Sequence, residues 1–428
     1  LTIGDSATAD GSYGVIGAAS ATLTTTAATS GDATTEESKA TGTSGTLIGV
    51  QLGDGDDTTA DNALTAGANL SLAGTSALTS AATATAVDGG AEAISTSTVA
   101  ATGVSLNESG VSTIGAGGTI LATGNVNLDA TASNVGTTAA TGTTDDARAL
   151  AGADKVVGFE MVDGTGATNT LTIGDAGTIT GGATVAADAT ATSVEADATA
   201  IAGGDGTDAL DVFGITTDGA GLLSIGAAGT LNATATSTLN ATAGTVTNAA
   251  VATVDAGQSQ GLLSEAVTIG AAGTVNAGAS LTGMAAATSV DDNATATSEV
   301  TQNIGFEADA AVNIGDAGTI ATTAGLTLQA TAATTGDNST TDAAIAQAGE
   351  AAGTSDNIAF LADIAGTTIG AGGTVTGAAT LSASAAASGT KADATADTEI
   401  DNNLGIDLGA QTLAVGAAGT VSGTATGT

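Results

Sequence analysis

The residues best suited to chemistry in this 428-residue chain are the carboxylates of one short acidic loop. Asp54, Asp56 and Asp57 stand in a single run between glycines and threonines, and Asp61 follows them. Carboxylate oxygens are ligands that Ca²⁺ prefers. The run departs from the EF-hand pattern, because threonine stands where that pattern has its turn glycine and again where it has its bidentate glutamate. Two interpretations stay open here, a weak Ca²⁺ site and a solvated acidic loop.

The chain has few side chains suited to chemistry other than binding of hard cations such as Ca²⁺. The chain has no His and no Cys, so the commonest general base and all thiolate ligands are missing. Paired carboxylates such as Asp291 and Asp292 are adjacent in the sequence, and on a strand they would face opposite sides. No phosphate-binding or dinucleotide-binding glycine loop stands out. We therefore predict that the chain is not an enzyme.

The charge limits the partners of the chain. It has 44 acidic and four basic residues, a net charge of −40, which repels nucleic acid and anionic membranes. No apolar run approaches the roughly 18 residues that a membrane helix needs, so we predict no membrane insertion. So much charge favours dissolved cations, either as screening salt or as bound Ca²⁺. The alternative is an acidic surface that keeps a long fibre in solution.

The elements that would position any such residue follow from an internal repeat. The pattern Ile/Val-Gly-x-x-Gly-Thr occurs seven times, at residues 114–119, 173–178, 225–230, 269–274, 314–319, 369–374 and 415–420. Each copy begins 59, 52, 44, 45, 55 and 46 residues after the one before it. Variable spacing around a recurring motif indicates loops of different length on one scaffold. We predict one elongated unit, with diverged repeats in residues 1–113 and a regular array in residues 114–428.

The diverged part contains three weaker copies of the motif. The first is predicted at residues 1–5, the second at residues 16–20, and the third around Ala66 and Gly67, before Leu70. The chain begins and ends within the repeat pattern, which motivates a hypothesis of head-to-tail assembly.

Composition and alternation predict an all-β fold. Stretches such as residues 187–200 alternate Ala with Thr or Ser, which places Ala on one face of a strand. The chain has 64 Gly and no Pro, as suits strands joined by tight turns. Aromatic residues make up only 1%, so we expect thin layers of small side chains between close sheets. A β-solenoid or stacked β-sheet fibre with repeats of roughly 45–59 residues satisfies these constraints. For the Ala-dense residues 342–351 a helix remains the alternative.

The motif itself predicts a corner. Its first residue would point into the core, its glycines would form the turn by adopting positive φ, and its Thr would restart the strand. The first turn glycines of the seven copies are Gly115, Gly174, Gly226, Gly270, Gly315, Gly370 and Gly416. Asp175 and Asp316 stand inside two of these turns, whereas the other five copies have Ala there. A metal ligand at this position is therefore not a requirement of the turn.

Two stretches resemble known secreted proteins. Residues 203–211 read Gly-Gly-Asp-Gly-Thr-Asp-Ala-Leu-Asp, which resembles the calcium-binding nonapeptide of RTX proteins. Residues 156–160 and 163–175 look like the β-rich repeats of RTX adhesins and calcium-dependent S-layer proteins. The resemblance implies an extracellular, Ca²⁺-supported, all-β protein exported without disulfides. It also implies Asp208 as a Ca²⁺ ligand, with Asp205 and Asp211 beside it. The chain departs from the family because the nonapeptide occurs once, not in tandem.

Six Asn-x-Ser/Thr sequons permit glycosylation of a surface protein. They begin at Asn69, Asn107, Asn232, Asn240, Asn293 and Asn338.

The sequence thus predicts a structural subunit of an extracellular filament, sheath or surface layer. It would assemble with copies of itself, head to tail or laterally, through strand edges and stacked repeats. One alternative is the stalk of a cell-surface adhesin that binds a glycan or a host surface through its loops. A second alternative is an acidic, calcium-binding matrix protein.

Overall fold

The computed structural model describes most of the chain. The described residues are 2–3, 13–30, 37–52, 65–87, 89–97, 100–108, 111–136, 146–163, 170–204, 209–336, 342–349, 355–362, 366–390, 393–408 and 412–428. Every regular element in these ranges is a β-strand. The described part of the chain accordingly contains no helix that could cross a membrane. The all-β prediction is confirmed, and the helical alternative for residues 342–351 is wrong where it can be checked, because Ala343–Gly349 is a strand.

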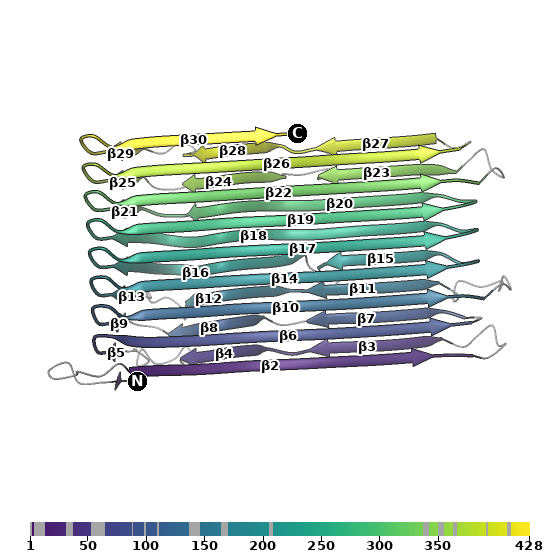
Figure 1. Ribbon diagram of the computed structural model, residues 1–428, viewed down its shortest axis with the longest axis horizontal. Coiled ribbons are helices and arrows are strands. Elements are labelled where there is room, and N and C mark those ends of the chain that lie inside the picture. Colours follow the sequence, from purple (N-terminus) through teal and green to yellow (C-terminus); the bar gives the residue numbers. More distant parts are fainter. Residues whose placement is uncertain are drawn as a thin grey trace.

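One parallel sheet, the long sheet, consists of the longest strands. Figure 1 shows its strands running in one direction across the slab-shaped molecule, with shorter strands running back. Its strands, in spatial order, are β2 (Tyr13–Ala28), β6 (Leu70–Ala86), β10 (Thr119–Asn134), β14 (Thr178–Ser193), β17 (Thr230–Thr245), β19 (Thr274–Ser289), β22 (Thr319–Thr334), β26 (Thr374–Gly389) and β30 (Thr420–Gly427).

The chain returns through a second parallel layer, the return sheet, in shorter pieces. Its described strands are β1 (Thr2–Ile3), β3 (Ser38–Ser44), β4 (Leu47–Leu52), β5 (Thr65–Ala66), β7 (Ala91–Ser97), β8 (Ala101–Glu108), β9 (Val111–Ile114), β11 (Ala147–Ala153), β12 (Lys155–Asp163), β13 (Thr170–Ile173), β15 (Ala198–Gly203), β16 (Leu210–Ile225), β18 (Ala250–Ile269), β20 (Ala294–Ala308), β21 (Val312–Ile314), β23 (Ala343–Gly349), β24 (Asp356–Ala362), β25 (Thr367–Ile369), β27 (Asp393–Glu399), β28 (Asn402–Asp407) and β29 (Leu413–Val415). One long strand and its return segments make one coil of a β-solenoid.

The coils stack in register, repeat upon repeat. The Thr that ends each motif pairs with the Thr of the next copy, as Thr230 does with Thr274 and Thr274 with Thr319. The 44-residue spacing is the minimal coil, in which β17 is followed by a short corner and by the uninterrupted return strand β18. The variable spacing therefore reflects insertions into one scaffold, as predicted.

The motif forms the corner between the return sheet and the long sheet. In the copy at residues 269–274, Ile269 is buried and the Gly273 N–H donates to the Gly270 carbonyl at 3.0 Å. The residue with positive φ is Ala272, at 58°, which is the pattern of a type II turn. The copies stack as well, since the Ala272 N–H donates to the Asp316 carbonyl at 2.7 Å.

The reason predicted for the corner glycines was therefore wrong. Positive φ falls on the fourth motif residue, which is Ala in five copies and Gly in the copies at 114–119 and 369–374. The other two glycines are required by close contact. A Cβ on Gly270 would lie 2.5 Å from the Ala227 nitrogen of the preceding coil, and a Cβ on Gly273 would collide with the side chain of Ile269.

Two further details of the predicted repeat change. Residues 16–20 are not a copy of the corner, because they lie inside the long strand β2, where Ile16 is 83% exposed. The alternating stretch 187–200 is not one strand either, because a second corner at residues 194–197 separates β14 from β15. The copy predicted around Ala66 and Gly67 does lie at a corner, between β5 and β6, with Asn69 at φ 62°.

The space between the sheets is divided into two lobes. The aliphatic lobe, next to the motif corner, holds large side chains such as Leu171, Ile269, Phe306 and Phe360. The alanine lobe, toward the other corner, is filled largely by alanines of both sheets, Ala296 among them. Burying an Ile, Leu or Phe side chain contributes about 1.5–3 kcal/mol, against about 0.8 kcal/mol for one methyl group. A typical side chain of the aliphatic lobe therefore contributes more hydrophobic stabilisation than a typical side chain of the alanine lobe, where small side chains let the sheets lie close together.

A file of glycines separates the lobes, and we call it the glycine waist. A Cβ on Gly214 of β16 would lie 2.5 Å from the Thr234 nitrogen of the long sheet. Gly261 of β18 faces Gly278 in the same way, with 2.6 Å from its added Cβ to the Gly278 nitrogen. The waist residues, one per coil, are Gly49, Gly103, Gly158, Gly214, Gly261, Gly305, Ala359 and Gly405. At the waist glycines the backbones of the two sheets touch with no side chain between them, and in the coil of β24 the Ala359 methyl group packs against Ala324 and Ala379 of the long sheet.

Candidate functional site

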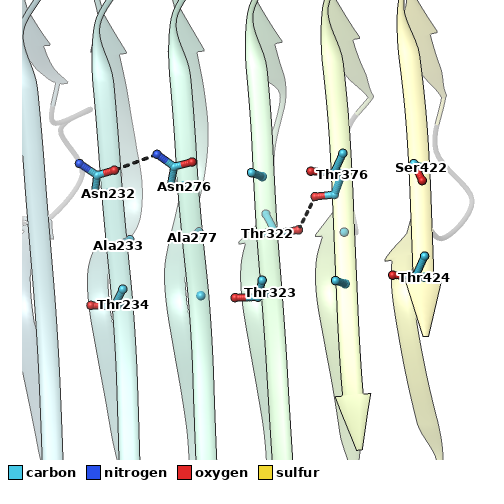
Figure 2. Close-up of a pocket in the computed structure, with 14 residues that line it drawn as sticks. Asn232, Ala233, Thr234, Asn276, Ala277, Thr322, Thr323, Thr376, Ser422 and Thr424 are labelled. Atoms are coloured by element: carbon cyan, nitrogen blue, oxygen red, sulfur yellow. Dashed lines mark hydrogen bonds between the residues drawn. The ribbon is translucent and has the colours of Figure 1, made fainter. Parts of the chain in front are cut away.

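A groove crosses the outer face of the long sheet at the positions that face the glycine waist. It has a volume of about 480 Å³ and runs from β17 to β30, across the strands. Thr234 and Gly278, which touch the waist glycines from the other side, line its floor. Figure 2 shows the side chains of Asn232, Asn276 and Thr376 along one border of the groove. The groove thus lies on the opposite side of the long sheet from part of the glycine waist.

The groove lining contains hydroxyl, amide and methyl groups and no charged side chain. The Asn276 amide nitrogen donates to the Asn232 amide oxygen at 2.9 Å, and the Asn232 amide nitrogen donates to the Thr180 hydroxyl at 3.4 Å. Between β22 and β26, the Thr322 hydroxyl donates to the Thr376 carbonyl at 3.2 Å. Such a surface can exchange hydrogen bonds and apolar contacts with a neutral partner. The lining residues include no carboxylate, lysine or arginine side chain.

A second polar device lies inside the solenoid. Asn303, Asn357 and Asn403 stack on consecutive coils, and each amide nitrogen donates to the next amide oxygen at 2.8 Å. Each also bonds across the interior to a carbonyl of the long sheet, as Asn357 does to Thr380 at 2.9 Å. Asn303 and Asn357 are fully buried. The ladder ties the two sheets together beside the waist in the last coils.

Cationic side chains of the described residues lie on the return sheet. Lys39, Glu92 and Arg148 occupy one file on three coils, with distances of 2.5 Å and 2.8 Å from the Glu92 oxygens to the two nitrogens. Burial by itself would raise the pKa of Glu92. The hydrogen bonds and charges of Lys39 and Arg148 outweigh burial and lower the pKa of Glu92 below its ordinary value.

Another ion pair on the return sheet joins Lys155 and Glu160 at 2.7 Å, and the Lys155 ammonium lies 5.6 Å from the Phe213 ring centroid. On β18, Asp255 is partly buried, and burial raises the pKa of Asp255 above its ordinary value. Its register partner on the next coil is Glu299. The return sheet therefore holds one carboxylate whose charge is stabilised by neighbouring cations, Glu92, and one whose charge is disfavoured by burial, Asp255.

The motif aspartates bind backbone. The Asp175 carboxylate accepts the Ala227 N–H at 2.9 Å, and the Asp316 carboxylate accepts the Ala371 N–H at 2.8 Å. In both cases the donor belongs to the corner of the next coil. The aspartates thus link successive corners, which gives them a structural role in the turn.

The predicted calcium ligands lie mostly outside the described residues. Asp54, Asp56, Asp57, Asp205 and Asp208 all fall there. Asp211 is the second residue of β16, and its carboxylate accepts the Gln258 N–H of the next coil at 3.0 Å. Within the described ranges no three acidic side chains gather in a geometry that could hold a metal ion.

The sequons occupy several different environments. Asn69 is exposed at a corner, and Asn232 lies in the groove. Asn240 donates to Asp188 at 2.6 Å on the outer face of the long sheet. The amide oxygen of Asn293 accepts the Ala343 N–H at 2.8 Å. Asn107 lies in β8, and Asn338 lies outside the described residues.

Sequence reasoning missed the groove and the asparagine ladder. The ladder does have a sequence signal, because Asn303, Asn357 and Asn403 each stand two residues before the waist position of their coil. The groove has a weaker signal. It follows from which long-strand residues face the waist, and this depends on how the two sheets are aligned.

Comparison with models of protein families, with curated proteins and with solved structures finds no match for this chain. A function for this chain is therefore inferred from its architecture and surfaces.

Proposed function

We propose that the chain is a structural subunit of an extracellular filament, sheath or surface layer, and that coils stack on coils to build it. The observation that supports this is the in-register ladder. Each inner coil pairs in register with the coil before it and with the coil after it, as β17 does with β14 and β19. The two stacking surfaces of a coil are therefore complementary to each other.

The outer coils offer the same stacking surface. Among the described strands, β2 pairs with β6 alone and β30 with β26 alone. An unpaired edge of a parallel sheet is a template for a further strand. A further coil, whether from a continuation of this chain or from another copy, would use the contacts that every inner coil already uses.

The direct test is electron microscopy of the purified chain at rising concentration. We expect polymers that lengthen along the solenoid axis. Particles that stay monomeric and are retained on immobilised glycan would overturn the proposal in favour of an adhesin stalk. Chelation with EDTA tests the calcium prediction separately, because unchanged circular dichroism and unchanged polymers would remove Ca²⁺ from the assembly.

A paired substitution makes the edge test specific. In a parallel strand, the N–H groups of successive residues point to opposite neighbours, so Thr24→Pro and Thr25→Pro each remove one donor. One of them removes a donor from the open edge of β2, and the other from the β2–β6 ladder. We expect one variant to keep the native circular dichroism and lose the polymers. Polymers in both variants would exclude the β2 edge as the growing end.

A further inference from the structure

The long sheet is almost free of charge in a protein of net charge −40. Its nine strands contain two of the 44 acidic residues, Asp129 and Asp188, and none of the basic ones. The return sheet carries charge on most of its coils, for example Glu92, Asp255 and Glu307. Two copies of so acidic a chain repel each other through most surfaces. The outer face of the long sheet is the face on which two copies can meet without that repulsion.

The side chains on this face are small, and they are arranged in regular files. Thr230, Thr274 and Thr319 form one file on consecutive strands, held in register by the ladder. Files of short side chains on a regular sheet let another sheet approach closely, at about 10 Å between backbones. The face is therefore suited to sheet-on-sheet packing.

Exposed apolar side chains project from the same face. Ile16 is 83% exposed, Leu121 is 51% exposed and Met284 is 40% exposed. All three stand at outward positions of long strands. Packing against a second copy would remove these apolar side chains from water.

The face is also large enough for a stable contact. Strands of 16 residues extend about 50 Å, and nine strands extend about 40 Å across the sheet, from standard strand dimensions. This footprint of about 2,000 Å² exceeds the roughly 800 Å² per partner of a standard specific interface.

We propose that the outer face of the long sheet, including its groove, is a lateral contact between two copies of this chain, packed face to face. The inference deepens the proposed structural function, because a sheath or layer needs a lateral contact in addition to coil stacking. It can be tested independently of filament growth. A neutral polysaccharide lying in the groove is the competing occupant, and the experiment below separates the two.

The test places one charge at the centre of the face. Thr236 lies outward on β17, the middle strand of the long sheet. Thr253 is the matched control, because it lies outward on β18 of the return sheet and is half-buried like Thr236. Thr236→Lys reduces the overall negative charge and should favour association on that ground alone. In a face-to-face pair, however, it sets two like charges in one interface.

Sedimentation velocity and electron microscopy read the outcome. For the wild-type chain and for Thr253→Lys we expect paired particles two solenoids thick, and stronger pairing as added salt screens the remaining repulsion. For Thr236→Lys, with native circular dichroism, we expect at least about a tenfold increase in the pairing Kd. Equal pairing of both variants would overturn the proposal.

The remaining outcomes are equally decisive. Wild-type filaments one solenoid thick would overturn the lateral contact and leave the filament proposal standing. Pairs that Thr236→Lys abolishes, without any polymers, would support the lateral contact and overturn the filament proposal. Retention of monomeric wild-type chain, but not of Thr236→Lys, on insoluble cellulose or chitin would assign the face to a neutral polysaccharide instead.

Discussion

The two lobes of a coil lie side by side between the same two sheets, yet they are built on opposite principles. Strand β20 crosses both, with Ala296 in the alanine lobe and Phe306 in the aliphatic lobe. Phe306 packs edge to face against Phe360 of the next coil, with ring centroids 5.3 Å apart and planes at 73°. Ala296 contributes one methyl group to a layer of similar methyl groups. The aliphatic lobe provides stabilising energy, and the alanine lobe fixes the spacing of the sheets.

This difference explains how a chain with 1% aromatic residues forms an ordered solenoid. The three fully buried phenylalanines, Phe159, Phe306 and Phe360, are placed in the aliphatic lobe, where the sheets stand far enough apart to hold them. Elsewhere the two sheets lie closer together, and the space between them is filled largely by alanines or, at the waist, closed by glycines. The comparison predicts that the lobes tolerate opposite kinds of substitution.

The largest expected effect is on the aliphatic side. Phe306→Ala removes a fully buried ring and its partner contact with Phe360, and should reduce the free energy of unfolding by about 3–5 kcal/mol. Ala296→Gly, on the same strand, should cost only about 1 kcal/mol. Urea unfolding followed by circular dichroism compares the two. Similar losses would show that the lobes share the stabilising energy equally.

Enlarging a side chain should be costly in the alanine lobe, whereas a modest reduction should be tolerated in the aliphatic lobe. Ala296→Leu forces three additional carbons between sheets already in contact through methyl groups, at a cost of about 1–3 kcal/mol or more. Phe306→Leu keeps a large apolar side chain in the aliphatic lobe and should cost less than Phe306→Ala. The same urea titrations check this. If Ala296→Leu is neutral, the alanine lobe does not set the sheet spacing.

The corner that closes the aliphatic lobe should respond in opposite directions at two neighbouring positions. Gly270→Ala places a Cβ against the backbone of the preceding coil and should cost about 1–3 kcal/mol. Ala272→Gly relieves a left-handed alanine and should stabilise the protein by up to about 1 kcal/mol. Thermal unfolding midpoints should therefore move down for the first variant and up for the second. Destabilisation by both would mean that the Ala272 methyl group makes a contact worth more than the backbone strain.

The fold could be predicted from the sequence because its signals are local and repeated. The alternation of Ala with Thr, and the recurring corner around Ile269, fix strand, turn and coil without any knowledge of tertiary contacts. The residue with positive φ could not be identified, because Gly270, Ala272 and Gly273 are all small and only the stacked geometry distinguishes steric need from conformational need. The prediction for residues 16–20 was wrong for a related reason. Their residue types fit the motif, but they lie inside a long strand and not at a corner of the coil.

The groove and the lateral face were harder to foresee. They depend on which side of each long strand faces outward and on where the return sheet contacts the long sheet. Those contacts follow from the alignment of Gly214 with Thr234 and of Gly261 with Gly278. The near absence of charge from the long strands was visible in the sequence once their bounds were known. The calcium prediction remains open, because most of its residues lie outside the described ranges.

The smallest expected effect concerns charge on the return sheet over the alanine lobe. Burial raises the pKa of Asp255, so between its ordinary and its raised pKa the folded state binds more protons than the unfolded state, and stability falls as pH rises. Asp255→Asn should therefore stabilise the protein at neutral pH, with a gain that vanishes below the ordinary carboxyl pKa. Glu92 supplies the opposite case, because its lowered pKa adds stability above its ordinary value that is lost as pH falls.

Urea midpoints measured across pH for Asp255→Asn and Glu92→Gln should thus diverge from the wild type in opposite directions at neutral pH. Both should converge with it in acid, when the two carboxylates are protonated in the folded and the unfolded chain alike. Parallel curves for the two variants would show that the overall charge of −40, and not the local setting of each carboxylate, controls the pH dependence. The opposite pH dependences follow only if the return sheet holds one carboxylate between two cations and another that is partly buried.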